Sequence, residues 1–288
     1  MPDNRCLKRY PRRAVNVSAK RCLFLLTLVI TSLSAISQEE SWDVYMAQYE
    51  KGAGSTVINM SAKDYAPLKE FPFLLETGVH LINCTGDGLP SKGEFDKLYK
   101  ISDKIKAVID AAAKNKLVGT FSYQCERIDY YYLGDTGAIR QKIEAVYKSA
   151  FPRYKYSITI RKDENWEAYL TFLYPNDETR EYMENEKVIL NLTKAGDNLS
   201  KPRQVDHWLY FKTEDDRSKF VAYCSNEHYK IEGKNFLKDA TLHYQLQISR
   251  VDNVDLSSIS KITILLRKKA SELNGSYDGW ETIVIKEK

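Results

Sequence analysis

The order of expected strands and helices is the feature that most constrains the fold of this chain. Between residues 71 and 161, segments with strand-like alternation and segments with helical spacing follow one another as β-α-β-β-α-β. The clearest strand, 154–161, alternates apolar and polar residues without a break. The clearest helix ends near Ala113 and is preceded by Ser91 and Glu94, at the spacing of a capping box. Few topologies fit such an order, because consecutive elements tend to pack side by side.

The same order returns later in the chain. An aromatic hairpin over 42–60 precedes the first set, and an expected strand at 166–174 and helix at 179–192 follow it. After the polar segment 197–203, β-α-β-β-α-β repeats from 205 to 285. This order is the ferredoxin-like, or split βαβ, arrangement. We therefore predict an α+β fold of two ferredoxin-like units, the first with extra strands and a helix.

The N-terminal segment has the pattern of a signal peptide. Seven Lys and Arg residues precede an apolar run, 22–36, which is shorter than the roughly 20 apolar residues that a membrane-spanning helix needs. Small residues at 35–37 place a cleavage site before Gln38. The predicted domains are a signal peptide at 1–37, an α+β domain at 38–198 and a ferredoxin-like domain at 199–288. The protein is expected to be exported, periplasmic or secreted, without a stable membrane span after cleavage; an uncleaved anchor is the alternative.

The charge balance changes once this segment is removed. The whole chain has 43 basic and 39 acidic residues, a net charge of +4. Residues 38–288 have 36 basic and 38 acidic residues, a net charge of −2. Because binding to a phosphate backbone depends on clustered positive charge, no nucleic-acid partner is expected.

Three cysteines remain beyond residue 37: Cys84, Cys125 and Cys224. Export permits one disulfide, but an odd count leaves at least one thiol free, and no pair has the close spacing of a zinc or redox motif. The sequence favours small buried thiols.

Two family resemblances follow from particular residues. The segment 203–211 and the run Tyr277-Asp278-Gly279-Trp280-Glu281-Thr282 resemble the regulator of ribonuclease E activity B family. The first half resembles the bacterial domain of unknown function 695 family, through Leu74-Leu75, Gly88-Leu89-Pro90 with Glu94, Leu117-Val118-Gly119, and Trp166-Glu167-Ala168-Tyr169 before Tyr174-Pro175.

The first of these resemblances implies a binding function without catalysis. Known members of that family are small cytoplasmic ferredoxin-like proteins that bind and inhibit an RNA-degrading enzyme without catalysing a reaction. The expected export signal separates this chain from an intracellular ribonuclease, so the resemblance implies the fold and a binding role rather than that partner.

Strand alternation over 205–211 assigns residues to the two faces of the second sheet. Val205, His207, Leu209 and Phe211 share one face, and Asp206, Trp208 and Tyr210 share the other. His207 is therefore expected among apolar side chains beneath the helices, which argues against a catalytic Asp–His pair.

The opposite face is the predicted binding surface, since a ferredoxin-like sheet has helices on one side only. Aromatic side chains among amides are typical of recognition surfaces. The candidate binding residues are Asp206, Trp208, Tyr210, His243, Gln245 and Trp280. Packing of this face against the first unit is the structural alternative. A hydrolase with carboxylates and a histidine in a cleft between the units is the functional alternative.

No residue pattern supports chemistry at a metal or cofactor. The four histidines, His80, His207, His228 and His243, lack the spacing of paired ligands. The tyrosines at 130–132 are expected to pack across strands. We assign no catalytic residue, no metal and no cofactor, and the expected partner is an unknown protein or small ligand.

Overall fold

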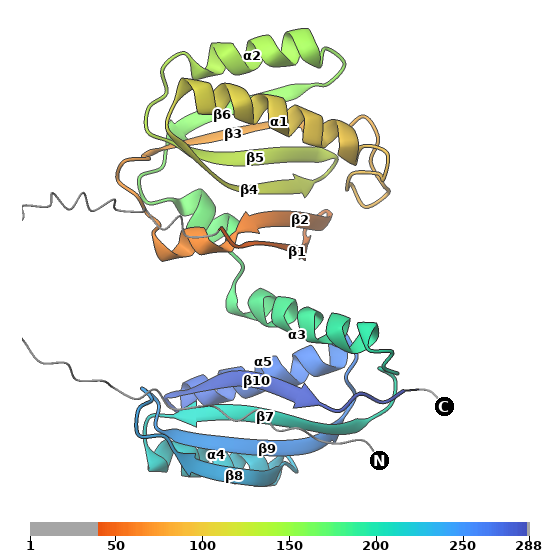
Figure 1. Cartoon of the computed structure of the whole chain (residues 1–288), viewed down its shortest axis with the longest axis vertical. Helices are drawn as coiled ribbons and strands as arrows, with labels where there is room; N and C mark the ends of the chain where they lie inside the picture. Colours follow the sequence, from red (N-terminus) through yellow and green to blue (C-terminus); the bar gives the residue numbers. More distant parts are fainter. Residues whose placement is uncertain (1–39, 287–288) are drawn as a thin grey trace, which may run out of the picture. The chain divides into compact units, whose positions relative to one another are not determined.

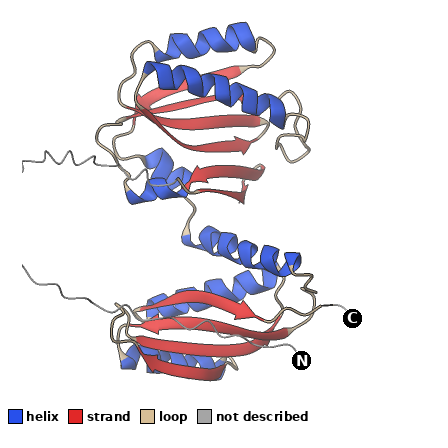
Figure 2. Cartoon of the chain, viewed as in Figure 1, coloured by secondary structure: helices blue, strands red, loops and turns tan. Residues whose placement is uncertain are grey.

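The computed structural model describes residues 40–286, which form two separate antiparallel sheets, each with helices on its flanks (Figures 1 and 2). We refer to residues 40–174 as the first unit and to residues 177–286 as the second unit. The predicted signal peptide, 1–37, lies outside the described residues.

The first unit contains the predicted β-α-β-β-α-β order. Its elements are β3 (Phe73–His80), α1 (Phe95–Ala112), β4 (Asn115–Tyr123), β5 (Glu126–Leu133), α2 (Ile139–Ala150) and β6 (Tyr156–Lys162). Within the sheet these strands lie in the order β4-β5-β3-β6, and every pair is antiparallel. This is the ferredoxin-like strand order. It confirms the fold expected for this half.

A hairpin extends this sheet on one side. It consists of β1 (Trp42–Tyr49) and β2 (Gly52–Asn59), and β2 pairs with β4 to give six strands in all. A short 3₁₀ helix, Met60–Asp64, leads from the hairpin toward β3. The extra strands predicted from 42–60 are therefore present.

The expected strand at 166–174 was wrong, because residues Ala168–Leu173 form a π-helix. Trp166 has a positive φ of 55° and its ring stacks on Tyr132 at 4.0 Å between centroids. The Asp163 carboxylate accepts hydrogen bonds from the backbone N–H groups of Glu167 and Ala168 at 2.8 and 3.0 Å. These contacts hold the chain in a turn that the local apolar pattern does not reveal.

Two layers of side chains cover the two faces of the first sheet. Tyr131 packs with the apolar residues of α1 and α2, whereas Tyr130 and Tyr132 pack with Trp166 and Tyr169 on the other face. All three consecutive tyrosines are buried. The expectation that they pack within the sheet is confirmed.

The second unit repeats the order. Its elements are α3 (Asp177–Lys194), β7 (Arg203–Phe211), α4 (Glu214–Asn226), β8 (Lys230–Phe236), β9 (Tyr244–Asp252), α5 (Leu256–Glu272) and β10 (Gly275–Thr282). The sheet order β10-β7-β9-β8 is again ferredoxin-like, with the first strand of the unit between the fourth and the third.

Helix α3 packs on the second sheet. The amide of Asn185, which is 1 % exposed, donates to Ser260 and Thr263 of α5 at 3.0 and 2.8 Å. Leu192 packs with Val205 in the same apolar cluster. By its contacts α3 therefore belongs with the second unit, although the boundary predicted after residue 198 would place it in the first.

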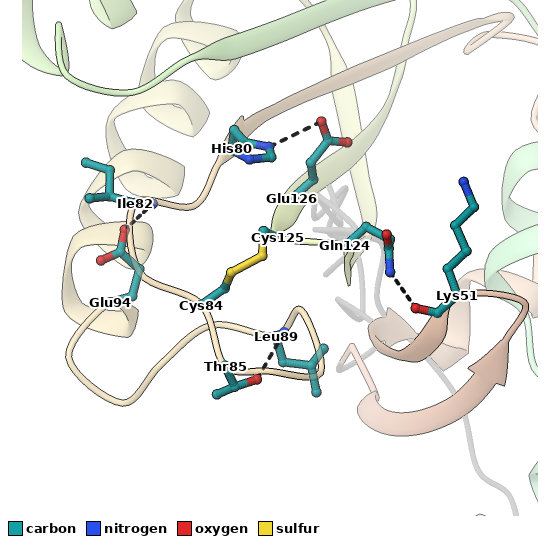
Figure 3. Close-up of a disulfide and its surroundings, with 10 residues drawn as sticks. All are labelled: Lys51, His80, Ile82, Cys84, Thr85, Leu89, Glu94, Gln124, Cys125 and Glu126. Carbon is teal, nitrogen blue, oxygen red and sulfur yellow. Dashed lines mark hydrogen bonds and ion pairs between the residues drawn. A yellow bond between two sulfur atoms is a disulfide. The ribbon is translucent and has the colours of Figure 1, made fainter.

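A disulfide joins Cys84 to Cys125 (Figure 3). Cys224 is free and buried. The buried-thiol interpretation holds for Cys224 and was wrong for the other two. Cys84 lies in the loop between β3 and α1, and Cys125 lies in the turn between β4 and β5, so residues distant in sequence come together at this end of the sheet.

The same loop is held by a buried carboxylate. Helix α1 begins at Phe95, and the side chain of Glu94 forms no cap hydrogen bond, so the expected capping box is not formed. Instead Glu94 accepts hydrogen bonds from the backbone N–H of Ile82, the amide of Asn83 and the hydroxyl of Tyr154. Burial opposes ionisation, but these bonds outweigh it and lower the pKa of Glu94.

Candidate binding face

His207 lies beneath the helices of the second unit, as the alternation of β7 predicts. Its side chain is fully buried, and Nδ1 lies 2.9 Å from the Tyr277 hydroxyl. Burial, with a smaller contribution from the positive charge of Arg250, lowers the pKa of His207 to about 3. A buried neutral imidazole with this pKa is a poor general base. The hydrolase alternative thereby loses its candidate histidine.

The other side of the sheet is the open face, which we define by the partly exposed residues of the two central strands. These are Asp206, Trp208 and Tyr210 of β7, and Gln245 and Gln247 of β9. The register sets Trp208 opposite Gln247 and Tyr210 opposite Gln245. Four of the six predicted binding residues therefore lie together as expected.

Hydrogen bonds fix the side chains of the open face in a row. Asn235 of β8 donates to Gln245 at 2.9 Å, and Gln245 donates to the hydroxyl of Tyr210 at 3.0 Å. Gln247 donates to Asp206 at 3.4 Å. These bonds reduce the side-chain entropy that a partner would have to remove on binding.

The predicted position of Trp280 was wrong. A β-bulge at Asp278 inserts one residue into β10, so Trp280 pairs with His207 and shares its face. Trp280 is only 9 % exposed, and its indole N–H donates to Asn185 of α3 at 2.7 Å. Trp280 is therefore a core residue beneath α3.

A glycine stands on the open face where the tryptophan was expected. Gly279 lies opposite Trp208, and a Cβ built on it would meet nothing within 4 Å. Its φ of 150° is a conformation that L side chains rarely adopt. A shallow hollow of about 410 Å³ results, lined by Trp208, Tyr210, Gln245, Asp278, Gly279, Trp280 and Glu281.

Asp278, Gly279 and Glu281 were not among the predicted binding residues. The signal for them was the Asp-Gly pair inside the Tyr-Asp-Gly-Trp run. A glycine within a strand often marks a bulge, after which the alternation changes face.

His243 lies at the margin of the open face rather than within it. It immediately precedes β9, and its Nδ1 is 2.9 Å from the carbonyl oxygen of Leu237. Its ring stacks on that of Phe236, with 5.5 Å between the centroids. These contacts hold His243 at the end of the sheet.

Within residues 40–286 no group of three or more His, Cys, Asp or Glu side chains is arranged to hold a metal ion. No helix in the same range is long and apolar enough to cross a membrane.

Each unit is similar to a different known family. Residues 40–174 match the model of a family of unknown function, DUF695, and residues 182–282 match the model of the regulator of ribonuclease activity B family. The two matches follow one another along the chain without overlap. Both resemblances predicted from the sequence are thereby confirmed, and the open face belongs to the regulator-like unit.

Other comparisons add less. No curated protein matches the chain. A crystal structure of an unknown protein from Galdieria sulphuraria matches 74 % of this chain and 99 % of its own, at 10 % identity and a TM-score of 0.21. A score this low supports no conclusion about fold or function.

Proposed function

We propose that this chain is an exported, non-catalytic binding protein, and that the open face of its second unit binds a protein partner. The observation that carries this proposal is the open face itself, where a partly exposed tryptophan and a partly exposed tyrosine lie among amides. The tyrosine is held in a hydrogen-bonded row with Gln245 and Asn235. Aromatic residues within a polar surround are typical of protein interfaces. The family matched by this unit is named for a regulatory role, which suits a binding protein.

Two features support the exported location. The N-terminal 37 residues have the basic and apolar pattern of a signal peptide. The disulfide between Cys84 and Cys125 suits an oxidising compartment, because cytosolic thiols are kept reduced. The intracellular ribonuclease suggested by the family name is therefore not the partner that we propose.

Site-specific photo-cross-linking tests the binding role. A photoreactive phenylalanine analogue at Tyr210 places the probe on the open face, and the same analogue at Leu265, which is 52 % exposed on α5, is the matched control. We expect a discrete cross-linked protein from envelope fractions with the Tyr210 probe, and its loss when Trp208→Ala is added. Equal cross-linking from both positions, or no effect of Trp208→Ala, would contradict the proposal.

A fusion of alkaline phosphatase to the C-terminus tests the location. This reporter needs its own disulfides, so it is active only outside the cytoplasm. We expect activity with the full chain and none after deletion of residues 1–37. Activity that survives the deletion would argue against export by this segment.

A further inference from the structure

We propose that the hollow above Gly279 receives a cationic side chain, arginine or lysine, from the protein partner. This inference rests on the proposed function, because it assumes that a partner docks on the open face. It adds the chemistry by which that partner is recognised.

The shape of the hollow provides the first argument. Gly279 forms its floor without a side chain, and Trp208 and Tyr210 stand on the neighbouring strand as one wall. The bulge at Asp278 moves Trp280 to the opposite side of the sheet, so this indole does not fill the space. An open floor beside an indole leaves room for a flat group to lie against the ring.

Charge provides the second argument. Asp278 and Glu281 line the hollow, and Asp206 lies opposite Glu281 on the next strand. Within residues 40–286 none of these three carboxylates forms an ion pair, and none of the lining residues is cationic. Glu232, elsewhere on the sheet, differs because it forms an ion pair with Lys230.

The indole ring and the neighbouring carboxylates together favour a cationic ligand. A cation is attracted by the face of an indole and by the adjacent carboxylates, and a guanidinium can stack on the ring while it bonds to a carboxylate. Phosphate groups would be repelled by the same carboxylates, which excludes a nucleic-acid backbone as occupant. The hydrogen-bonded amides beside the hollow offer polar contacts to the rest of a peptide segment.

Nuclear magnetic resonance on the ¹⁵N-labelled chain from Gln38 onward tests the inference. The probes are the blocked peptide Gly-Arg-Gly and its analogue with citrulline, which has nearly the shape of arginine without the charge. We expect the indole N–H signal of Trp208 to shift with the arginine peptide, with a Kd of about 1 mM, as fits a few kcal/mol from one side chain. The citrulline peptide should bind about tenfold more weakly, a difference of about 1.4 kcal/mol.

Variants that replace a carboxylate by its neutral amide show which carboxylate contributes to binding of the arginine peptide. Glu281→Gln and Asp278→Asn should each raise the Kd of the arginine peptide about threefold to fivefold. Glu232→Gln is the matched control, because that carboxylate is already paired within the sheet, and it should leave the Kd unchanged. The indole signal of Trp280, bonded to buried Asn185, reports in the same spectra whether each variant keeps its fold.

The outcomes separate this inference from the proposed function. Equal binding of the arginine and citrulline peptides, or equal effects of Glu281→Gln and Glu232→Gln, would overturn the inference. If the Tyr210 probe still captures a partner in that case, the binding role stands without the cationic contact. If the arginine peptide binds as expected but the open face captures no partner, the binding role fails and the site is only a binder of free cationic peptides.

Discussion

Trp208 and Trp280 lie on neighbouring strands of one sheet and face opposite sides of it. Trp208 is partly exposed beside Gly279, whereas Trp280 is buried and bonded to Asn185 of α3. The inserted residue Asp278 produces this difference, because a shift of one residue turns every following side chain to the other face.

We expect the two tryptophans to respond differently to truncation. Trp280→Ala removes a buried ring and leaves the side-chain carbonyl oxygen of Asn185 without its donor, so the free energy of unfolding should fall by about 3–5 kcal/mol. Trp208→Ala should cost about 1 kcal/mol or less, since its ring is only partly buried. Urea denaturation of both variants measures the difference, and equal losses would contradict the placement of the bulge.

These residues also show how far a single sequence can define the candidate site. Alternation along β7 predicted that His207 points inward and Trp208 outward, and both placements are correct. Alternation along β10 predicted the wrong face for Trp280. A bulge depends on the backbone geometry between two strands and leaves no periodic pattern in the sequence. That Asp206, Asp278 and Glu281 form no ion pair within residues 40–286 could not be recognised either, since ion pairing depends on contacts that the sequence does not specify.

At the scale of elements, local patterns predicted more than tertiary packing did. The order β-α-β-β-α-β appears in both units because each strand and helix has its own periodicity. The π-helix Ala168–Leu173 was missed, because Trp166 and Asp163 hold it through contacts with Tyr132, more than 30 residues away. Helix α3 was found, but nothing in its own sequence reveals which sheet it covers.

The loop between β3 and α1 is the element whose stability depends most on one covalent link. The disulfide between Cys84 and Cys125 spans 41 residues, a separation that corresponds to about 4 kcal/mol in the chain-entropy model. The double variant Cys84→Ala/Cys125→Ala should therefore lose about 2–4 kcal/mol of unfolding free energy, because hydrogen bonds to Glu94 still hold part of the loop.

Reductant provides the control for this prediction. It should lower the denaturation midpoint of the wild-type chain and leave that of the double variant unchanged, since buried Cys224 forms no disulfide. A thiol titration of the denatured chain from Gln38 onward should find one free thiol before reduction and three after it. Three thiols before reduction would show that the disulfide is absent.

At the scale of the whole molecule, both units bury carboxylates, and the second unit also buries the neutral imidazole of His207. The first unit buries Glu94 and Asp163, and the second buries Asp197; burial would raise the pKa of Asp197, but hydrogen bonds from Arg203 and the backbone N–H of Ile285 lower it. Burial would raise the pKa of Asp163, but hydrogen bonds from Tyr132, Ala168 and Glu167 outweigh it and lower this pKa, as similar bonds do for Glu94. Acid should therefore begin to destabilise the second unit, through His207, at a higher pH than the first unit.

For the second unit, the free energy of unfolding should begin to fall as the pH drops below about 6.5. The unfolded chain takes up a proton on His207 below this value, whereas the folded unit resists protonation down to about pH 3. The free energy of unfolding should thus fall by up to about 1.4 kcal/mol for each pH unit across this range. In the first unit, the lowered pKa values of Glu94 and Asp163 contribute stability above about pH 4, which is lost as the pH falls further.

Urea titrations at pH 7, 5.5 and 4.5, followed through the indole signals of Trp166 and Trp280, provide one probe in each unit. The free energy of unfolding reported by Trp280 should fall between pH 6.5 and 4.5. The value reported by Trp166 should stay unchanged over this range. His207→Phe removes the titrating group in an aromatic environment beside Tyr229, so it should flatten the pH dependence of the second unit even if it costs stability at pH 7. His228→Asn, at an exposed turn, should leave the dependence intact. An unchanged slope in His207→Phe would mean that another group, rather than the buried imidazole, makes the second unit sensitive to acid.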